Sequence, residues 1–133
     1  MMEPLERLLH ERAIERLLVE YVALNDAGEW DKLASTYVPE GRMSRPTAPD
    51  DFIEGRESIL AAFKARPPRA SRHVVANIRV DVGEGEQATA RSQILLFLEQ
   101  KSAPLVGSYE DRLVLTDQGW RFSERRGSLD FAD

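Results

Sequence analysis

The sequence predicts an α+β domain in which three N-terminal helices pack against one face of a curved, mostly antiparallel sheet. Two observations carry this prediction. Apolar residues recur at helical spacing in the first half of the chain, and they alternate with a period of two in the second half. The change of period follows Pro67-Pro68, and no linker or repeat interrupts the sequence, so we expect one domain over residues 1–133.

The first half is expected to hold the helices. A long first helix runs from about Glu3 to Ala27, and Gly28 ends it in the manner of a glycine just beyond the last helical turn. The remaining elements of this half are a short helix, a short strand, a Pro- and Asp-rich loop and a third helix, over residues 29–37, 41–45, 46–51 and 56–65.

The second half is expected to form four long strands, over residues 73–82, 88–99, 105–115 and 120–129. The segment 94–98 is apolar on both faces. One face is expected to meet the helices, and a second copy of the chain, packed sheet to sheet, would cover the other. The alternative to a second copy is that the curvature of the sheet itself buries the other face, which gives a two-sided core.

Composition excludes several classes of function. The net charge of −5 and pI of about 5.1 argue against a nucleic-acid or acidic-membrane partner. The absence of cysteine excludes disulfides, thiol catalysis and cysteine-ligated metals. No apolar run approaches the roughly 20 residues that span a membrane. The charged N-terminus is unlike a secretory signal, so we expect a cytoplasmic protein.

Asp26 is the first candidate for chemistry. It continues the apolar stripe of the first helix, one turn beyond Val22, where a carboxylate is unfavourable unless it is paired, hydrated or used. His73 opens the first long strand, and histidine is the side chain best suited to proton transfer near neutral pH. An Asp26–His73 pair would form if the first helix crosses the sheet. The alternative is a capping aspartate and a strand-edge histidine that never meet.

The strand pattern opposes this pairing. Alternation over 73–82 places His73 and the more apolar residues on opposite faces, so that a helix packed on the apolar face would leave His73 pointing away from Asp26. Asp26 and His73 can pair only if the apolar face of this strand lies at the dimer interface, or if a β-bulge turns the side chains at the start of the strand toward the helix.

Other polar residues are candidates for a pocket lining. Tyr109 and Asp111 share a strand face, and Tyr21 lies on the apolar side of the first helix. All three have a purely structural alternative, as packed aromatics or an ion-paired carboxylate. Asp26, His73 and Asp111 would together suit a metal, but nothing in their spacing indicates one.

Five segments of the chain have a familiar pattern: residues 21–33 (YVALNDAGEWDKL), 55–59 (GRESI), 72–77 (RHVVAN), 107–113 (GSYEDRL) and 119–126 (GWRFSERR). Through these segments the chain resembles, over nearly its whole length, SnoaL-like proteins of the nuclear-transport-factor-like, cystatin-like superfamily. The resemblance implies a cone-shaped α+β fold. An aspartate before Trp-Asp and a strand-opening histidine are similar to those of scytalone dehydratase and bile-acid 7α-dehydratase. Unlike scytalone dehydratase, this chain has no histidine after His73.

The resemblance implies a role for each candidate. Asp26 and His73 would act as the general base and acid, and Tyr21, Asn77, Tyr109 and Asp111 would line the pocket. It also implies that His73 and Asn77 face inward, which leaves the apolar face for the homodimer. No cofactor or metal is implied.

The leading hypothesis is therefore a cofactor-independent dehydratase or isomerase acting on a cyclic, polyketide- or steroid-like hydrophobic molecule. The alternatives are a non-catalytic small-molecule-binding module and a structural β-type subunit of a larger oxygenase.

Overall fold

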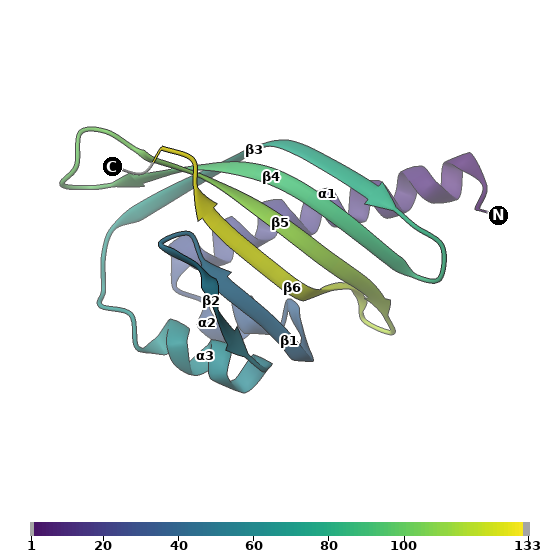
Figure 1. The fold of residues 1–133 in the computed structure, drawn as a ribbon, viewed down its shortest axis with the longest axis horizontal. Coiled ribbons are helices and arrows are strands. Elements are labelled where there is room, and N and C mark those ends of the chain that lie inside the picture. The colour runs from purple at the N-terminus through teal and green to yellow at the C-terminus, as the bar shows by residue number, and fades with distance from the viewer. Residues whose placement is uncertain (1, 132–133) are drawn as a thin grey trace.

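The structure, a computed structural model that describes residues 2–131, has helices on the concave side of one six-stranded sheet (Figure 1). In chain order the elements are α1 (Pro4–Ala27), α2 (Trp30–Ala34), β1 (Tyr37–Arg45), β2 (Ala48–Glu54), α3 (Arg56–Lys64), β3 (Ser71–Val82), β4 (Gln87–Leu98), β5 (Leu105–Thr116) and β6 (Gly119–Leu129). The strand order is β2-β1-β6-β5-β4-β3, and every neighbouring pair is antiparallel except β1–β6. The predicted α+β class with a curved, mostly antiparallel sheet is confirmed.

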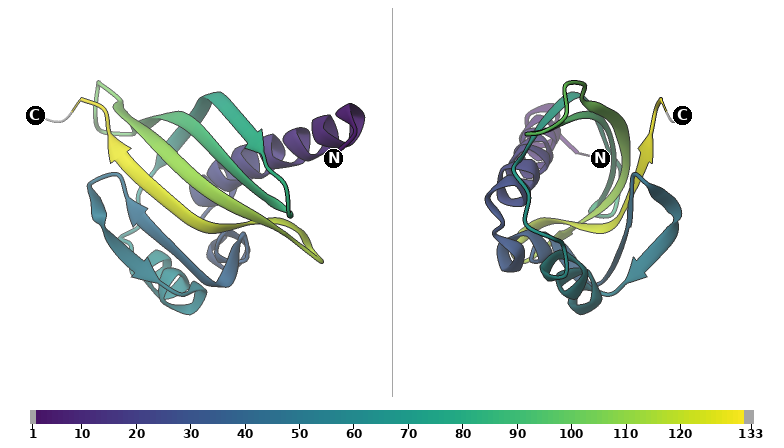
Figure 2. Two further views of the ribbon diagram at one scale, coloured as in Figure 1. Left: turned by 45° about the vertical axis from the view of Figure 1, so that its right-hand side comes forward. Right: turned by 90° about the vertical axis from the view of Figure 1, so that its left-hand side faces the viewer.

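Helix α1 forms one wall of the cone. Figure 2 shows the sheet curling around the interior, with α1 along one side and α2 and α3 at the end opposite the N-terminus. The helix begins with Pro4, whose missing amide hydrogen is not needed in a first turn. It ends at Gly28, which adopts φ +71°, a left-handed conformation that glycine tolerates without strain.

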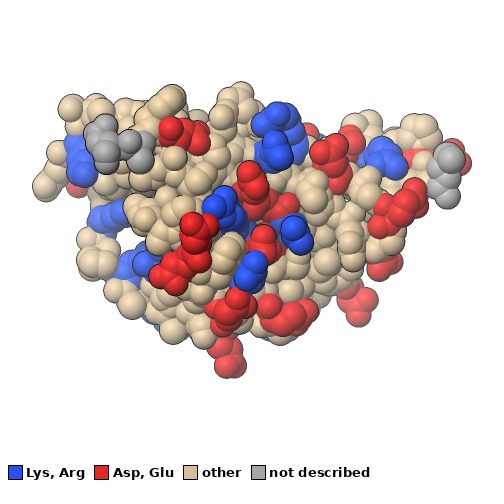
Figure 3. All heavy atoms as spheres, in the orientation of Figure 1, with Lys and Arg blue, Asp and Glu red and all other residues tan. Residues whose placement is uncertain are grey.

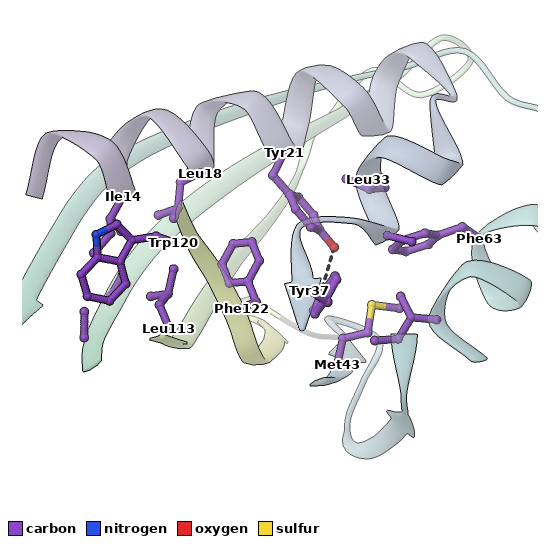
Figure 4. Packing of buried hydrophobic residues seen from close by; sticks show 14 of the residues in the cluster. Ile14, Leu18, Tyr21, Leu33, Tyr37, Met43, Phe63, Leu113, Trp120 and Phe122 are labelled. Atoms are coloured by element: carbon purple, nitrogen blue, oxygen red, sulfur yellow. Dashed lines mark hydrogen bonds between the residues drawn. The ribbon is translucent and has the colours of Figure 1, made fainter. Parts of the chain in front are cut away.

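The apolar stripe of α1 packs against the far end of the sheet. Ile14, Leu18 and Tyr21 are buried and point toward side chains of β5 and β6, including Leu113 and Phe122 (Figure 4). These contacts remove apolar surface from water, at roughly 25 cal/mol per Å², and fix the helix across the sheet. The C-terminal end of α1, with Asp26, is thereby placed over the start of β3.

The structure corrects the prediction for residues 29–54. The second helix is shorter than expected, because the chain is already extended at Tyr37 and β1 includes Pro39. The expected loop at 46–51 is wrong, since most of it belongs to β2. Proline and aspartate are depleted in central strands, but β2 is an edge strand, where a missing amide hydrogen and exposed charges are tolerated.

The convex face of the sheet carries charges of both signs. Figure 3 shows Lys or Arg and Asp or Glu side chains interspersed over the middle of this face. A shallow depression there is lined by residues that include Arg79, Arg91, Glu110, Arg112 and Glu124. No helix within residues 2–131 is long and apolar enough to span a membrane.

Candidate active site

A cavity of about 780 Å³ opens at the wide end of the cone, between the end of α1, the link from α3 to β3, and β4 and β5. Its volume lies in the range typical of small-molecule sites. Its lining combines apolar strand residues with polar and cationic groups from the helix ends, the strands and the link from α3 to β3. The lining includes Asn25, Asp26, Trp30, Arg45, Thr47, Lys64, Arg66, Arg69, Ser71, His73, Ile94, Leu96, Leu105, Gly107, Tyr109 and Leu129.

The strand register explains how this lining arises. Residues directly opposite in an antiparallel pair share a face, so each inward row crosses several strands. His73, Leu96 and Leu105 form one row of the cavity floor, and Ile94, Gly107 and Leu129 form the next. Gly107 has no side chain, and a Cβ there would lie 2.8 Å from the Ser128 carbonyl oxygen, so this part of the floor must stay flat.

Asp26 and His73 meet on the cavity wall. Asp26 Oδ1 lies 2.6 Å from His73 Nδ1, and Oδ2 accepts a 2.7 Å hydrogen bond from the His73 backbone amide. Ser71 Oγ donates a third, 3.2 Å bond to Oδ1. Both side chains are largely buried, with exposed fractions of 11% for Asp26 and 5% for His73. An ionised carboxylate only accepts hydrogen bonds, so Nδ1 carries the proton and Nε2 is left free.

The surroundings of His73 favour the neutral imidazole. Burial lowers the pKa of His73 from its ordinary value of 6.5, and Arg69 and Arg66 lower it further, while the hydrogen bond and charge of Asp26 oppose these effects. A neutral ring with one free nitrogen can accept a proton. The resulting imidazolium would be stabilised by Asp26.

A bulge in β3 determines which of its side chains face inward. The register shifts between Ala76 and Arg79, and Asn77 has φ +53°, in the left-handed region that asparagine tolerates. Before the bulge His73 faces the cavity, and after it Val82 faces the core. A regular strand would have placed these two residues on opposite faces.

The bulge also corrects two expectations. Asn77 does not line the cavity, because it is exposed and its side-chain amide bonds Gln93 on the neighbouring strand. The apolar residues of β3 do not form one continuous outer face. Val74 is exposed, whereas Ile78 and Val80 pack against the core.

The two tyrosines expected in the pocket are separated by the structure. Tyr109 lines the cavity, and burial raises its pKa to about 12, so its hydroxyl stays protonated. Tyr21 lies in the core and does not line the cavity. Its hydroxyl is 2.8 Å from that of Tyr37, as the dashed line in Figure 4 shows.

Asp111 lies behind the cavity, paired with Arg125, which the sequence prediction had overlooked. Arg125 is only 1% exposed, its Nε is 3.1 Å from Asp111 Oδ1, and its guanidinium lies 3.7 Å from the centre of the Tyr109 ring and 4.2 Å from that of Tyr21. The contact lacks hydrogen-bond geometry, and both groups otherwise have no polar partner. Burial raises the pKa of Asp111 to about 6, although Arg125 acts to lower it.

The sequence also gave no specific role to Arg45 and Arg66, which the structure brings to the cavity. Arg45 ends β1 and donates to the Ala62 carbonyl oxygen at 3.2 Å, and Arg66 follows α3 and donates to Asn25 Oδ1 at 3.0 Å. The signal that could have found them is the group of arginines at positions 42, 45, 66, 69 and 72, which makes the middle of the chain locally basic. Within residues 2–131, no cluster of three or more histidine or acidic side chains is arranged to hold a metal ion.

Comparison with solved structures places this site in a known fold. A scytalone dehydratase-like protein from Novosphingobium aromaticivorans superposes with a TM-score of 0.82 at 25% identity, over 94% of this chain and 87% of that one. A Mycobacterium tuberculosis protein of unknown function superposes with a TM-score of 0.83 at 23% identity, over 98% and 78%.

Sequence comparison gives the family. The Caenorhabditis elegans protein isy-1 is 30% identical over 108 residues, which are 81% of this chain and 35% of that protein. The chain thus spans about a third of the length of this curated relative. Residues 6–126 match the SnoaL-like domain family, and the chain therefore belongs to that family.

Proposed function

We propose that this protein is an acid–base lyase or isomerase that removes water, or shifts a double bond, next to a carbonyl group of a hydrophobic cyclic molecule. The observation that carries the proposal is the Asp26–His73 hydrogen bond on the wall of a roughly 780 Å³ cavity. The likeness to a scytalone dehydratase-like protein supports it.

In the proposed reaction His73 acts first as a base and then as an acid. Its free Nε2 takes the proton on the carbon next to the carbonyl, and the C–H electron pair moves into a C=C bond as the carbonyl oxygen becomes an enolate oxygen. The electron pair then returns and expels a β-hydroxyl group, which takes the proton from Nε2 and leaves as water. Asp26 stabilises the imidazolium between these steps. The proposed steps require no cofactor.

Tyr109 is the residue we assign to the carbonyl oxygen. A phenol whose pKa is about 12 remains a donor at neutral pH, and its hydrogen bond strengthens as negative charge develops on that oxygen. Tyr21 is assigned a supporting role instead, because it packs against the Arg125 guanidinium that also packs on Tyr109.

The apolar floor of the cavity suits a ring-shaped, hydrophobic substrate. Ile94, Leu96, Leu105 and Leu129 lie on the strand side, and Trp30 lies on the helix side. These side chains exclude water from the reacting atoms, which strengthens the electrostatic effect of Asp26 and Tyr109.

The test is hydrogen exchange, because it requires no knowledge of the natural substrate. A panel of cyclic ketones and β-hydroxyketones is incubated with the protein in D2O, and deuterium at the carbon next to the carbonyl is measured by NMR. The wild type is expected to catalyse the exchange, and Asp26→Asn and His73→Ala to lose at least about a hundredfold in rate. His10→Gln, which alters the only other histidine, is the control. Full activity in either site variant would refute the mechanism.

We further propose a homodimer that packs through the convex sheet face. Val74 and Phe97 are 44% and 42% exposed on the outer side of β3 and β4. The charges of both signs interspersed over the middle of this face (Figure 3) suit a two-fold interface, in which each patch meets its own copy. Sedimentation should show a dimer that Val74→Glu dissociates, and a wild-type monomer at micromolar concentration would overturn this part of the proposal.

A further inference from the structure

The cavity has the opposite charge to the chain that builds it. The chain carries a net charge of −5, yet four cationic side chains line the cavity: Arg45, Lys64, Arg66 and Arg69. Among the described lining residues, Asp26 is the single acidic side chain. These cations lie at the end of β1, at the end of α3 and on the link from α3 to β3.

Of these four cations, the nearby carboxylates pair with Lys64 alone among the described residues. Asp26 is engaged by His73 and Ser71, and its nearest arginine is Arg72, at 4.0 Å, which is outside the lining. Lys64 has a partner, Asp31, at 3.6 Å. Within residues 2–131, no ion pair is formed by the three arginines of the lining.

Two of these arginines are held in place but keep unused donors. Arg45 bonds the Ala62 carbonyl through one N–H, and its Nε–H is buried without a partner. Arg66 bonds Asn25 through one N–H, and its guanidinium lies 4.8 Å from the centre of the Phe63 ring. A guanidinium has five N–H donors, so most of the donors of each residue remain available.

A structural role alone does not account for this arrangement. Arginines near the C-terminal end of a helix are favoured by its carbonyl groups, and the bond from Arg45 to Ala62 is of that kind. That role uses one donor. It leaves the other N–H groups of Arg45, like those of Arg66, without a hydrogen-bond partner among the described residues, and the ones that face the cavity can donate to a bound molecule.

We infer that the molecule bound here is an organic carboxylate, whose anionic group is held by Arg45 and Arg66 while its hydrophobic rings lie on the strand floor. A carboxylate accepts paired hydrogen bonds from a guanidinium, which matches the unused donors. Arg69, exposed on the link to β3, adds positive charge at the entrance. This inference rests on the proposed function for the reaction at His73, and it specifies the class of substrate.

The test compares two ligands that differ in charge and little else. Calorimetric titration with 2-naphthoate and with 2-naphthamide measures whether the charge is recognised. We expect the wild type to bind the acid at least about tenfold more tightly, and to lose part of that preference when salt is raised from about 50 to about 500 mM. Equal affinities for the acid and the amide, or binding of neither at millimolar concentration, would overturn the inference.

Substitutions of Arg66 and Arg45 test whether these side chains recognise the carboxylate. Arg66→Gln and Arg45→Gln are expected to weaken naphthoate about tenfold and to change naphthamide less than about twofold. Arg91→Gln, on the convex face, is the matched control and should change neither. If Arg45→Gln does not fold, Arg45→Lys is used instead. Lysine keeps the positive charge but not the paired N–H donors of the guanidinium, so an intermediate loss of naphthoate affinity is expected. Unchanged acid preference in the folded Arg66 and Arg45 variants would contradict the assignment.

The two proposals fail separately. His73→Ala should retain the preference for naphthoate while losing deuterium exchange. A protein that prefers the acid but never exchanges deuterium would refute the proposed reaction and leave the anion site intact. A protein that exchanges deuterium without preferring the acid would refute the anion site and leave the proposed reaction intact.

Discussion

The carboxylate of Asp26 holds His73 at two points, its backbone amide at 2.7 Å and its ring Nδ1 at 2.6 Å. One residue thus fixes both the start of strand β3 and the orientation of the imidazole. Because α1 and β3 each carry one partner, the packing of the helix across the sheet sets the geometry of the pair. Both partners are therefore carried by a helix and a strand rather than by loops, which favours a precise arrangement.

Asp26→Asn should lower the pKa of His73 further. The charge and hydrogen bond of Asp26 raise that pKa against burial, so their loss leaves the lowering effects unopposed. An NMR titration of the His73 ring proton measures the change, with His10→Gln used for assignment. Ser71→Ala is the matched control, since it removes only the 3.2 Å bond to Oδ1. A pKa that rises or stays constant in Asp26→Asn would contradict this account.

The stability of the protein should depend on pH through His73. Its pKa is lower in the folded state than the ordinary 6.5, so just below pH 6.5 the unfolded chain binds more protons. The free energy of unfolding should therefore fall as the pH drops from about 6.5 toward the folded-state pKa. Urea unfolding between pH 8 and pH 5 measures this slope.

His73→Asn isolates that contribution. Asparagine keeps a donor for Asp26 but does not titrate, so the variant should lose less stability than the wild type over the same pH range. Parallel curves for the two proteins would show that His73 does not contribute the slope.

Removing one partner of the buried Asp111–Arg125 pair should destabilise the protein strongly, whereas replacing both with apolar residues should destabilise it little. Arg125→Met leaves a carboxylate buried without a countercharge, and we expect a loss of about 3–5 kcal/mol in the free energy of unfolding. The double variant Asp111→Leu/Arg125→Met removes both charges and should recover most of that loss. Urea unfolding of the wild type, Asp111→Leu, Arg125→Met and the double variant gives the coupling energy.

The pH dependence of the single variant provides a second check. Asp111 already has a pKa of about 6 with Arg125 beside it, and removal of that cation raises the pKa further. The carboxyl then becomes neutral in mild acid, so Arg125→Met should be less destabilising at pH 5 than at pH 8. A pH-independent loss would show that charge burial is not its cause.

Periodicity was sufficient to predict the fold class and the long elements, because each long regular element leaves a local pattern. The helical stripe ending at Gly28 and the alternation after Pro67-Pro68 located α1 and the four long strands. Strand β2 was missed because Pro49 and its acidic neighbours are atypical of strands, and only its position at the sheet edge makes them acceptable.

The site was harder to predict from the sequence than the fold class, because it depends on contacts between residues that are distant along the chain. Asp26 and His73 are 47 residues apart, and only the family resemblance favoured their pairing. The bulge at Asn77 reverses the faces of β3, and one asparagine does not predict it. Arg45 and Arg66 converge only after β1 and α3 are packed, so their shared cavity could not be foreseen.

Gly127→Ala should disturb the cavity from behind its wall. A Cβ at Gly127 would lie 2.7 Å from both the backbone nitrogen and Cδ of Pro46, which real contacts essentially never reach. Pro46 stands between Arg45 and Thr47 in the lining, so its displacement should move both residues. We expect about 1–3 kcal/mol of destabilisation, the usual cost of overpacking, together with weaker 2-naphthoate binding. Gly83→Ala is the control, because its nearest contact, the Gln87 carbonyl oxygen at 3.4 Å, is an ordinary one. If Gly127→Ala melts and binds like Gly83→Ala, the turn at Pro46 does not position Arg45.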